Sequence, residues 1–152
     1  MILGCKPGIG RHMMYLEIKH DKEYSMKLNV GCGTDIHDGY VNIDNLKDYQ
    51  NLEYFKDTFI NEYKNIDILD KYIENGTFIV KDATVLDYPK ESIDEIISYR
   101  FIGRYDVDIE SYYDVLKDRG KLKIYCSKWN GDFFKKLTNT FDRKESVQTT
   151  IL

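Results

Sequence analysis

Short apolar segments alternate with longer segments of helical periodicity from Lys27 onward. The short segments are rich in β-branched and aromatic residues and span 27–30, 40–43, 77–80, 93–98 and 121–126. Between several of them, apolar residues recur at steps of three and four, which is the spacing of one helix face. This alternation predicts an α/β domain with a Rossmann-like, mostly parallel sheet and crossover helices on both faces.

Three segments of the chain show the helical spacing. Between the second and third strands it predicts one long helix or two shorter ones, from apolar residues at Leu52, Phe55, Phe59, Tyr63, Ile66, Leu69 and Ile73. A second helix is predicted over 109–116, with Arg119-Gly120 as its stop signal. A final helix carries Phe133, Leu137 and Phe141. We expect these stripes to face the core rather than a ligand.

The connection between the first two strands is unusually short. Only six residues separate Gly33 from Tyr40, whereas a helical crossover needs about a dozen. We therefore expect the first helix to be a single turn or absent, with Asp38-Gly39 forming the turn into the second strand.

Residues 1–26 do not share this pattern, apart from an alternating patch at 14–18 that is compatible with a strand. We treat them as an N-terminal extension and residues 27–152 as the domain. Near the end of the chain, residues 147–152 are compatible with one further strand.

Composition narrows the class of protein. The net charge is −4 without a concentrated basic face, so nucleic acid is not an expected partner. No apolar run approaches the roughly 20 residues that span a bilayer, so no membrane association is expected. Three cysteines without CxxC spacing predict neither a disulfide framework nor a zinc site, and no metal site is expected. A cytoplasmic location fits these features best.

The clearest chemistry lies in the stretch from Lys27 to Asp44. A strand that ends in Gly31-Cys32-Gly33 lets a ligand approach the backbone, because glycine has no Cβ and tolerates positive φ. Asp44 closes the second strand, where a carboxylate can accept both hydroxyl protons of a ribose. The pattern indicates a ribose-containing cofactor. The alternative is a tight turn followed by a surface aspartate.

Two features argue against a nicotinamide dinucleotide. Ile36 stands where the dinucleotide fingerprint has its third glycine. Asp44 follows Gly33 by only 11 residues, whereas the acid of that fingerprint comes roughly 20 residues after the motif. An NAD-dependent oxidoreductase is therefore disfavoured.

The same stretch resembles the first motif of a family of predicted class I S-adenosylmethionine-dependent methyltransferases. In that family an apolar strand, Gly-Cys-Gly, a short loop, Gly-aromatic-Val-Asn and an acidic residue follow in this order. The likeness continues at Asp82-Ala83, in the proline-containing loop and strand of 86–97, and in the helix, glycine turn and strand of 113–124. It covers about residues 27–127.

The resemblance implies S-adenosylmethionine as cofactor and a role for each matching residue. Gly31, Cys32 and Gly33 would lie under the methionine and ribose, and Asp44 would bind the ribose hydroxyls. Asp82 would contact the adenine amino group, from which a carboxylate accepts well, with Ala83 alongside. Asp82 as a plain surface or helix-capping acid stays an alternative.

The chain departs from the family at three places. Asn29 replaces an acid that in many methyltransferases helps to hold the cofactor's ammonium; an asparagine can accept that hydrogen bond without the charge. A His-x-Leu-Glu-His-like segment is replaced by residues 99–105, so no catalytic residue can be transferred. Class I domains usually end in an antiparallel hairpin, and this chain has room for one of its two strands, so we expect that hairpin to be incomplete.

The replaced segment suggests its own chemistry. Its arginines and tyrosines would shape an acceptor pocket for an anionic or aromatic substrate, because guanidinium groups bind carboxylates and phosphates bidentately; these residues are Tyr99, Arg100, Arg104 and Tyr105. Ordinary surface packing is the alternative. His37 is the histidine that lies in the cofactor loop, either as a participant or as a solvated loop residue.

These features lead to one main functional hypothesis. We expect S-adenosylmethionine-dependent methyl transfer to a small-molecule or saccharide-type acceptor. The alternative is a non-catalytic or truncated methyltransferase-like domain that keeps the nucleoside cleft. An unfinished sheet edge would favour pairing with a second copy of the chain.

Overall fold

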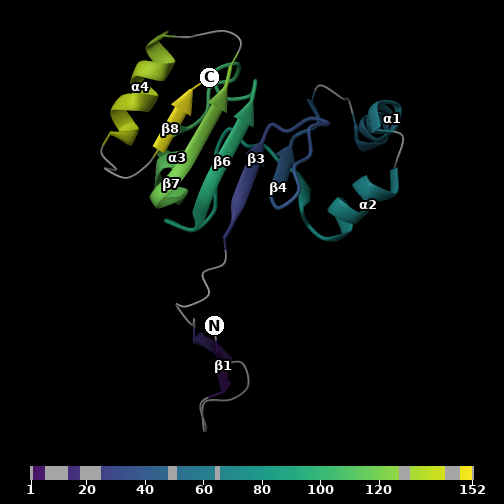
Figure 1. Ribbon diagram of the computed structural model, residues 1–152, viewed down its shortest axis with the longest axis horizontal. Helices are drawn as coiled ribbons and strands as arrows, with labels where there is room; N and C mark the ends of the chain where they lie inside the picture. The colour runs from purple at the N-terminus through teal and green to yellow at the C-terminus, as the bar shows by residue number, and fades with distance from the viewer. Residues whose placement is uncertain are drawn as a thin grey trace.

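The computed structural model describes residues 2–5, 14–17, 25–47, 51–63, 66–126, 131–142 and 148–151. Its main body is a six-stranded sheet in the order β5-β4-β3-β6-β7-β8 (Figure 1). The strands are β3 (Lys27–Val30), β4 (Val41–Asp44), β5 (Phe78–Val80), β6 (Ile93–Tyr99), β7 (Leu116–Tyr125) and β8 (Gln148–Ile151). Every pairing in this sheet is parallel, which confirms the predicted α/β Rossmann-like fold.

Helices connect most of the strands. Two shorter helices, rather than one long one, join β4 to β5: α1 (Leu52–Tyr63) and α2 (Ile66–Glu74). α3 (Ile109–Val115) precedes β7, and α4 (Gly131–Phe141) lies between β7 and β8. Figure 1 shows α1 and α2 at the β4 end of the sheet and α3 and α4 at the β7 and β8 end. The connection from β3 to β4 contains no helix, as its length predicted.

The two helix pairs cover opposite faces of the sheet. Ile43 of β4 packs in one apolar cluster with Tyr112 of α3 and with side chains of α4. Phe78 of β5 packs in another with Phe55 of α1. Phe78 is in register with Asn42, which precedes Ile43, and successive strand residues point to opposite faces. The predicted placement of helices on both faces is therefore confirmed.

The start of β7 is irregular. α3 ends at Val115, and Leu116 already pairs with Ile93 of β6 before a shift in register. Arg119 adopts a left-handed conformation (φ 63°). A Cβ on Gly120 would lie 2.8 Å from the Lys117 carbonyl oxygen. Arg119-Gly120 therefore shapes a bend inside β7 rather than the end of the helix itself.

The remaining strands lie near the two ends of the chain. β1 (Ile2–Cys5) and β2 (Met14–Glu17) form a separate antiparallel sheet, and β2 coincides with the predicted patch at 14–18. β8 pairs parallel with β7 because α4 crosses over between them. We expected an incomplete antiparallel hairpin at this end of the chain. Among the described residues, the main sheet instead ends in the single strand β8, which is parallel to its neighbour.

No helix within the described ranges is long and apolar enough to cross a membrane.

Candidate functional site

A cavity of about 570 Å³ lies at the carboxyl ends of β3, β4, β5 and β6. The strand order runs outward in opposite directions from β3 and β6, so this is the switch point at which open α/β sheets bind ligands. Its volume falls within the roughly 300–1,000 Å³ of ligand pockets. The cavity brings together the predicted cofactor residues Gly31, Cys32, Gly33, Asp44, Asp82 and Ala83. Asn29 does not line it.

Asp44 anchors the glycine loop. Its Oδ2 accepts a hydrogen bond from the Gly33 amide (2.8 Å), and its Oδ1 accepts one from the Leu46 amide (2.7 Å). Each carboxylate oxygen can accept two hydrogen bonds. Asp44 is half-buried at the cavity wall and therefore keeps acceptor capacity for a ligand on both oxygens.

Gly31 makes close contact with a residue that sequence reasoning did not single out. Gly31 has a φ of +61°, and a Cβ built on it would lie 2.3 Å from Cγ of Phe101. The space that glycine leaves open is therefore filled by the Phe101 ring, which also lines the cavity. Because Phe101 lies far along the chain from Gly31, no local pattern predicts this contact.

Cys32 is buried, with 6% of its surface exposed. Burial raises the pKa of its thiol, and the nearby negative charge of Asp44 adds to the shift. The thiol is therefore protonated at neutral pH and donates to the Gly33 carbonyl oxygen (3.3 Å). Cys32 can shape the cavity floor, but it is not an activated nucleophile.

Asp82 and Ala83 follow β5 on the same side of the cavity as Asp44. Oδ1 of the exposed Asp82 accepts from the Thr84 amide (2.8 Å), which leaves Oδ2 for other donors. Ala83 is 3% exposed, and its carbonyl oxygen accepts from the buried Tyr112 hydroxyl (2.6 Å). The pair thus presents a carboxylate next to a small, fixed apolar surface.

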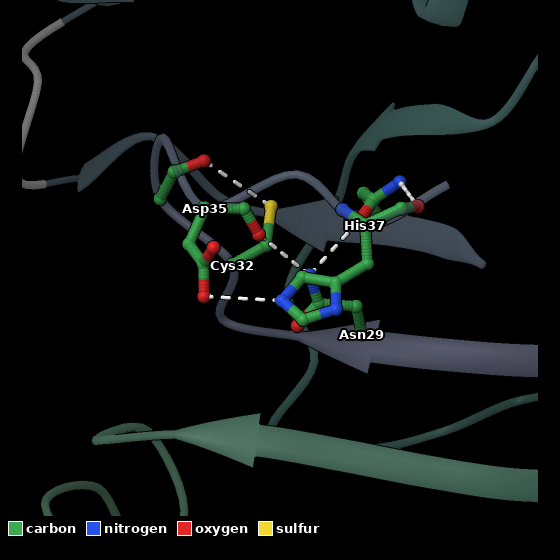
Figure 2. Close-up of polar contacts among 6 residues, drawn as sticks. Asn29, Cys32, Asp35 and His37 are labelled. Carbon is green, nitrogen blue, oxygen red and sulfur yellow. Dashed lines mark hydrogen bonds and ion pairs between the residues drawn. The ribbon is translucent and has the colours of Figure 1, made fainter. Parts of the chain in front are cut away.

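Asn29 is hydrogen-bonded to the loop that follows β3. Its Nδ2 donates to the Asp35 carbonyl oxygen (2.7 Å) and to Oδ1 of Asn42 (2.9 Å), as Figure 2 shows in part. Asn29 is 1% exposed, and its Oδ1 has no hydrogen-bond partner among the described residues. A buried acceptor without a partner is costly. The carbonyl oxygen of Asp35 fixes this orientation, because it must face an amide nitrogen.

Asn42 organises the loop that replaces the first helix. Its Oδ1 accepts from the His37 amide (2.8 Å), and its Nδ2 donates to the carbonyl oxygens of His37, Tyr40 and Thr77. Asn42 is fully buried. A polar residue in a short apolar strand was the available signal for this role, which sequence reasoning missed.

His37 lies at the edge of the site rather than inside it. Its Nε2 is 3.2 Å from Oδ2 of Asp35, and Figure 2 shows the two side chains facing each other. The imidazole ring packs 5.7 Å from the rings of both Tyr40 and Tyr99. Asp35 and Tyr99 line the cavity, whereas His37 does not.

The segment after β6 forms the opposite wall, with Tyr99, Arg100, Phe101, Arg104 and Tyr105. Tyr99 stacks on Tyr125, with ring centroids 4.2 Å apart. Asp94 belongs to the same strand but is not part of this wall. β6 begins at Ile93, so Asp94 lies at the opposite end, where its carboxylate accepts from the Met26 amide and Lys117.

No group of histidine, cysteine and carboxylate side chains within the described residues could hold a metal ion.

Comparison with known proteins adds little to this geometry. No protein-family model matches the chain. No curated protein matches it either. It is similar to the crystal structure of a candidate S-adenosyl-L-methionine-dependent methyltransferase from Methanococcus maripaludis, at 14% sequence identity and a TM-score of 0.45. The similarity covers 79% of this chain and 56% of the other, so this chain spans little more than half of that protein's length.

Proposed function

We propose that this protein binds S-adenosylmethionine in the cavity and transfers its methyl group to a small-molecule or saccharide-type acceptor. The observation that carries the proposal is Asp44. A carboxylate at the end of β4 lies beside a glycine loop, and each of its oxygens accepts one backbone hydrogen bond. One further acceptor site on each oxygen suits the two hydroxyls of a ribose.

The neighbouring residues fit the rest of such a nucleoside. Asp82 keeps one oxygen for an amino group, and Ala83 offers apolar surface beside it. Asn29 has an unpartnered acceptor, which suits an ammonium group. Because Asn29 is buried behind residues 31–35, that contact requires the loop to shift.

The chemistry would need little from the protein beyond placement. S-adenosylmethionine, when bound, supplies a methyl group on a positively charged sulfur that is a good leaving group. The chain's own residues would hold the acceptor in line with that methyl group and limit access of water. We assign no residue as a general base.

A second candidate is a nucleoside-binding domain without transfer activity. Two observations favour it: the Phe101 ring fills the space beside Gly31, and Asn29 does not line the cavity. The two candidates share the nucleoside site and differ in methyl transfer, so a binding test comes before an activity test.

The binding test is calorimetric titration of S-adenosylmethionine and S-adenosylhomocysteine into wild type and Asp44→Asn. The variant keeps the size of the side chain but loses the charge and one acceptor oxygen. We expect it to weaken binding by about tenfold or more, because hydrogen bonds to a charged group contribute roughly 1.5–3 kcal/mol. Asp57→Asn, on an exposed position of α1, controls for loss of charge.

NAD serves as the control ligand and should not bind. Failure of both methionine nucleosides to bind folded wild type would contradict the proposal. Binding without methyl transfer to any acceptor in a broad screen would favour the non-catalytic candidate.

A further inference from the structure

We infer that the acceptor is an anionic molecule with a flat, aromatic body, and that Arg100 and Arg104 bind its carboxylate or phosphate group. This inference rests on the proposed function, since it concerns the acceptor side of the same cavity. The two walls of the cavity differ in the charges that they carry.

The wall formed after β4 and β5 carries the acidic residues suited to the nucleoside, Asp44 and Asp82, together with Lys47 and Lys81. Lys81 forms an ion pair with Asp87. The wall formed after β6 carries Arg100 and Arg104 and no acidic residue. An anion entering the cavity therefore meets charges of both signs at the wall after β4 and β5 but only positive charge at the wall after β6, which favours binding at the latter.

Neither arginine forms an ion pair with an acidic side chain of the described residues. Several lysines of the domain are paired: Lys56, Lys117 and Lys123 each form an ion pair with an acidic side chain. No ion pair of Arg100 or Arg104 is formed with a described residue, and both are exposed at the cavity. Two guanidinium groups without carboxylate partners can bind an anion without first breaking an existing pair.

The backbone holds the two arginines in a fixed turn. The Arg100 amide donates to the Tyr125 carbonyl oxygen (2.7 Å), and the Ile102 amide donates to Oγ of Ser98 (2.9 Å). The Phe101 carbonyl oxygen accepts from the amides of both Arg104 (3.2 Å) and Tyr105 (2.9 Å). A site built on a hydrogen-bonded turn loses less conformational freedom on binding than one on a free loop.

Aromatic rings flank the arginines. The Arg104 guanidinium lies over the Tyr105 ring, 5.4 Å from its centroid, which leaves the in-plane N–H groups available to a ligand. Phe101 and Tyr99 line the same wall, and Tyr99 is 39% exposed although it is stacked on Tyr125. Exposed ring faces beside guanidinium groups favour a flat body attached to the anionic group.

The test is a ¹⁵N NMR titration of the protein saturated with S-adenosylhomocysteine. The probes are benzoate and phenyl phosphate, which separate carboxylate from phosphate, and neutral benzamide as a control ligand. We expect the two anions to shift the amide signals of residues 99–105. Arg100→Gln and Arg104→Gln should each weaken anion binding by about tenfold, and benzamide should show no such difference.

Two further variants separate the effect of charge from the effect of position and side-chain geometry. Arg119→Gln removes the same charge from a position with nearly the same φ (63° against 62° at Arg100) that does not line the cavity, and should leave binding unchanged. Arg100→Lys keeps the charge but loses the bidentate fork, and should show a smaller loss. Arg100→Lys also tests the inference if Arg100→Gln does not fold.

The outcomes separate this inference from the proposed function. If S-adenosylhomocysteine binds but the anions bind equally well to wild type and the arginine variants, or not at all, the inference is wrong and the proposed function stands. If the arginine variants weaken S-adenosylhomocysteine instead, the arginines bind the carboxylate of the nucleoside, and the inference is again wrong. If wild type binds the anions through these arginines but no nucleoside, the proposed function fails and the anion site stands.

Discussion

Gly31 and Phe101 are in contact at the carboxyl end of β3, and this contact leaves no room for a side chain larger than that of glycine at position 31. Gly31→Ala would place a methyl group 2.3 Å from Cγ of Phe101 and force a non-glycine residue to a φ of +61°. We expect a loss of about 2–4 kcal/mol in the free energy of unfolding, from the left-handed conformation and overpacking together. Urea unfolding measures it.

The chain offers a matched control for the conformational part. Gly39 also has positive φ (+80°), but a Cβ built there has no heavy atom within 4 Å among the described residues beyond its two chain neighbours. Gly39→Ala should therefore cost only about 1 kcal/mol. In a Phe101→Ala background, Gly31→Ala should cost about the same as Gly39→Ala. An equal cost for the two glycine substitutions in wild type would show that Phe101 does not pack on Gly31.

At the scale of elements, Glu95 links the loop before β4 to β6 and β7. It lies on the sheet face opposite α3, is 6% exposed, and accepts from the Tyr40 hydroxyl (2.5 Å) and from Nζ of Lys123 (3.1 Å). Burial alone would raise the pKa of Glu95. The hydrogen bonds from Tyr40 and Lys123 and the charges of Lys123 and Lys27 outweigh it, so the pKa is lowered on folding.

This shift predicts how stability depends on pH. A carboxyl group with a lowered folded pKa stabilises the fold above its unfolded pKa, about 4.3, and loses that contribution as the pH falls through the folded pKa. We expect Glu95→Gln to be less stable than wild type by about 1 kcal/mol at pH 7. The difference should shrink below about pH 4.

Urea unfolding between pH 3 and pH 7 measures this difference. Glu74→Gln, at an exposed position of α2, is the control and should show no comparable pH-dependent difference. A Glu95→Gln difference that stays constant over this range would show that the carboxylate charge contributes nothing.

At the scale of the whole molecule, the cavity joins two halves of the sheet. One wall comes from the loops after β3, β4 and β5, and the other from the segment after β6. A ligand that spans both walls must slow opening of both. With S-adenosylhomocysteine at about 100 times its Kd, we expect hydrogen exchange to slow by up to about 100-fold wherever exchange requires the site to open.

Mass spectrometry of peptides measures this exchange. Residues 31–35, 81–84 and 99–105 should be protected together, whereas amides of α4 that exchange by local opening should be unaffected because α4 does not line the cavity. Protection of 31–35 alone would show that the ligand contacts one wall only.

Local pattern was sufficient for most of the secondary structure. β3 and β6 follow predicted apolar runs closely, and α1 and α2 follow a helical stripe. The short span from Gly33 to Tyr40 correctly excluded a full helix, since a chain of that length cannot form one and still reach the next strand. These features depend on neighbouring residues, so the sequence alone shows them.

The candidate site was predictable only in part. Because strands in a parallel sheet present their carboxyl ends at one edge, Asp44 and Asp82 meet the glycine loop at one cavity once the strands are assigned. Asn29 was expected at the same cavity, but its side chain turns to the other face of β3 and binds Asn42. The alternation of side chains along a strand gave a signal for this, since Leu28 and Val30 face the core.

The sequence by itself therefore determined the order and type of the elements and the edge at which a ligand site can form, because these follow from periodicity and chain length. Only the tertiary structure decided that Phe101 fills the space beside Gly31, that Arg100 and Arg104 have no acidic partner among the described residues, and that β8 runs parallel to β7. Each of these depends on contacts between residues distant in the chain, and their energies are set by packing and by charge rather than by local propensity.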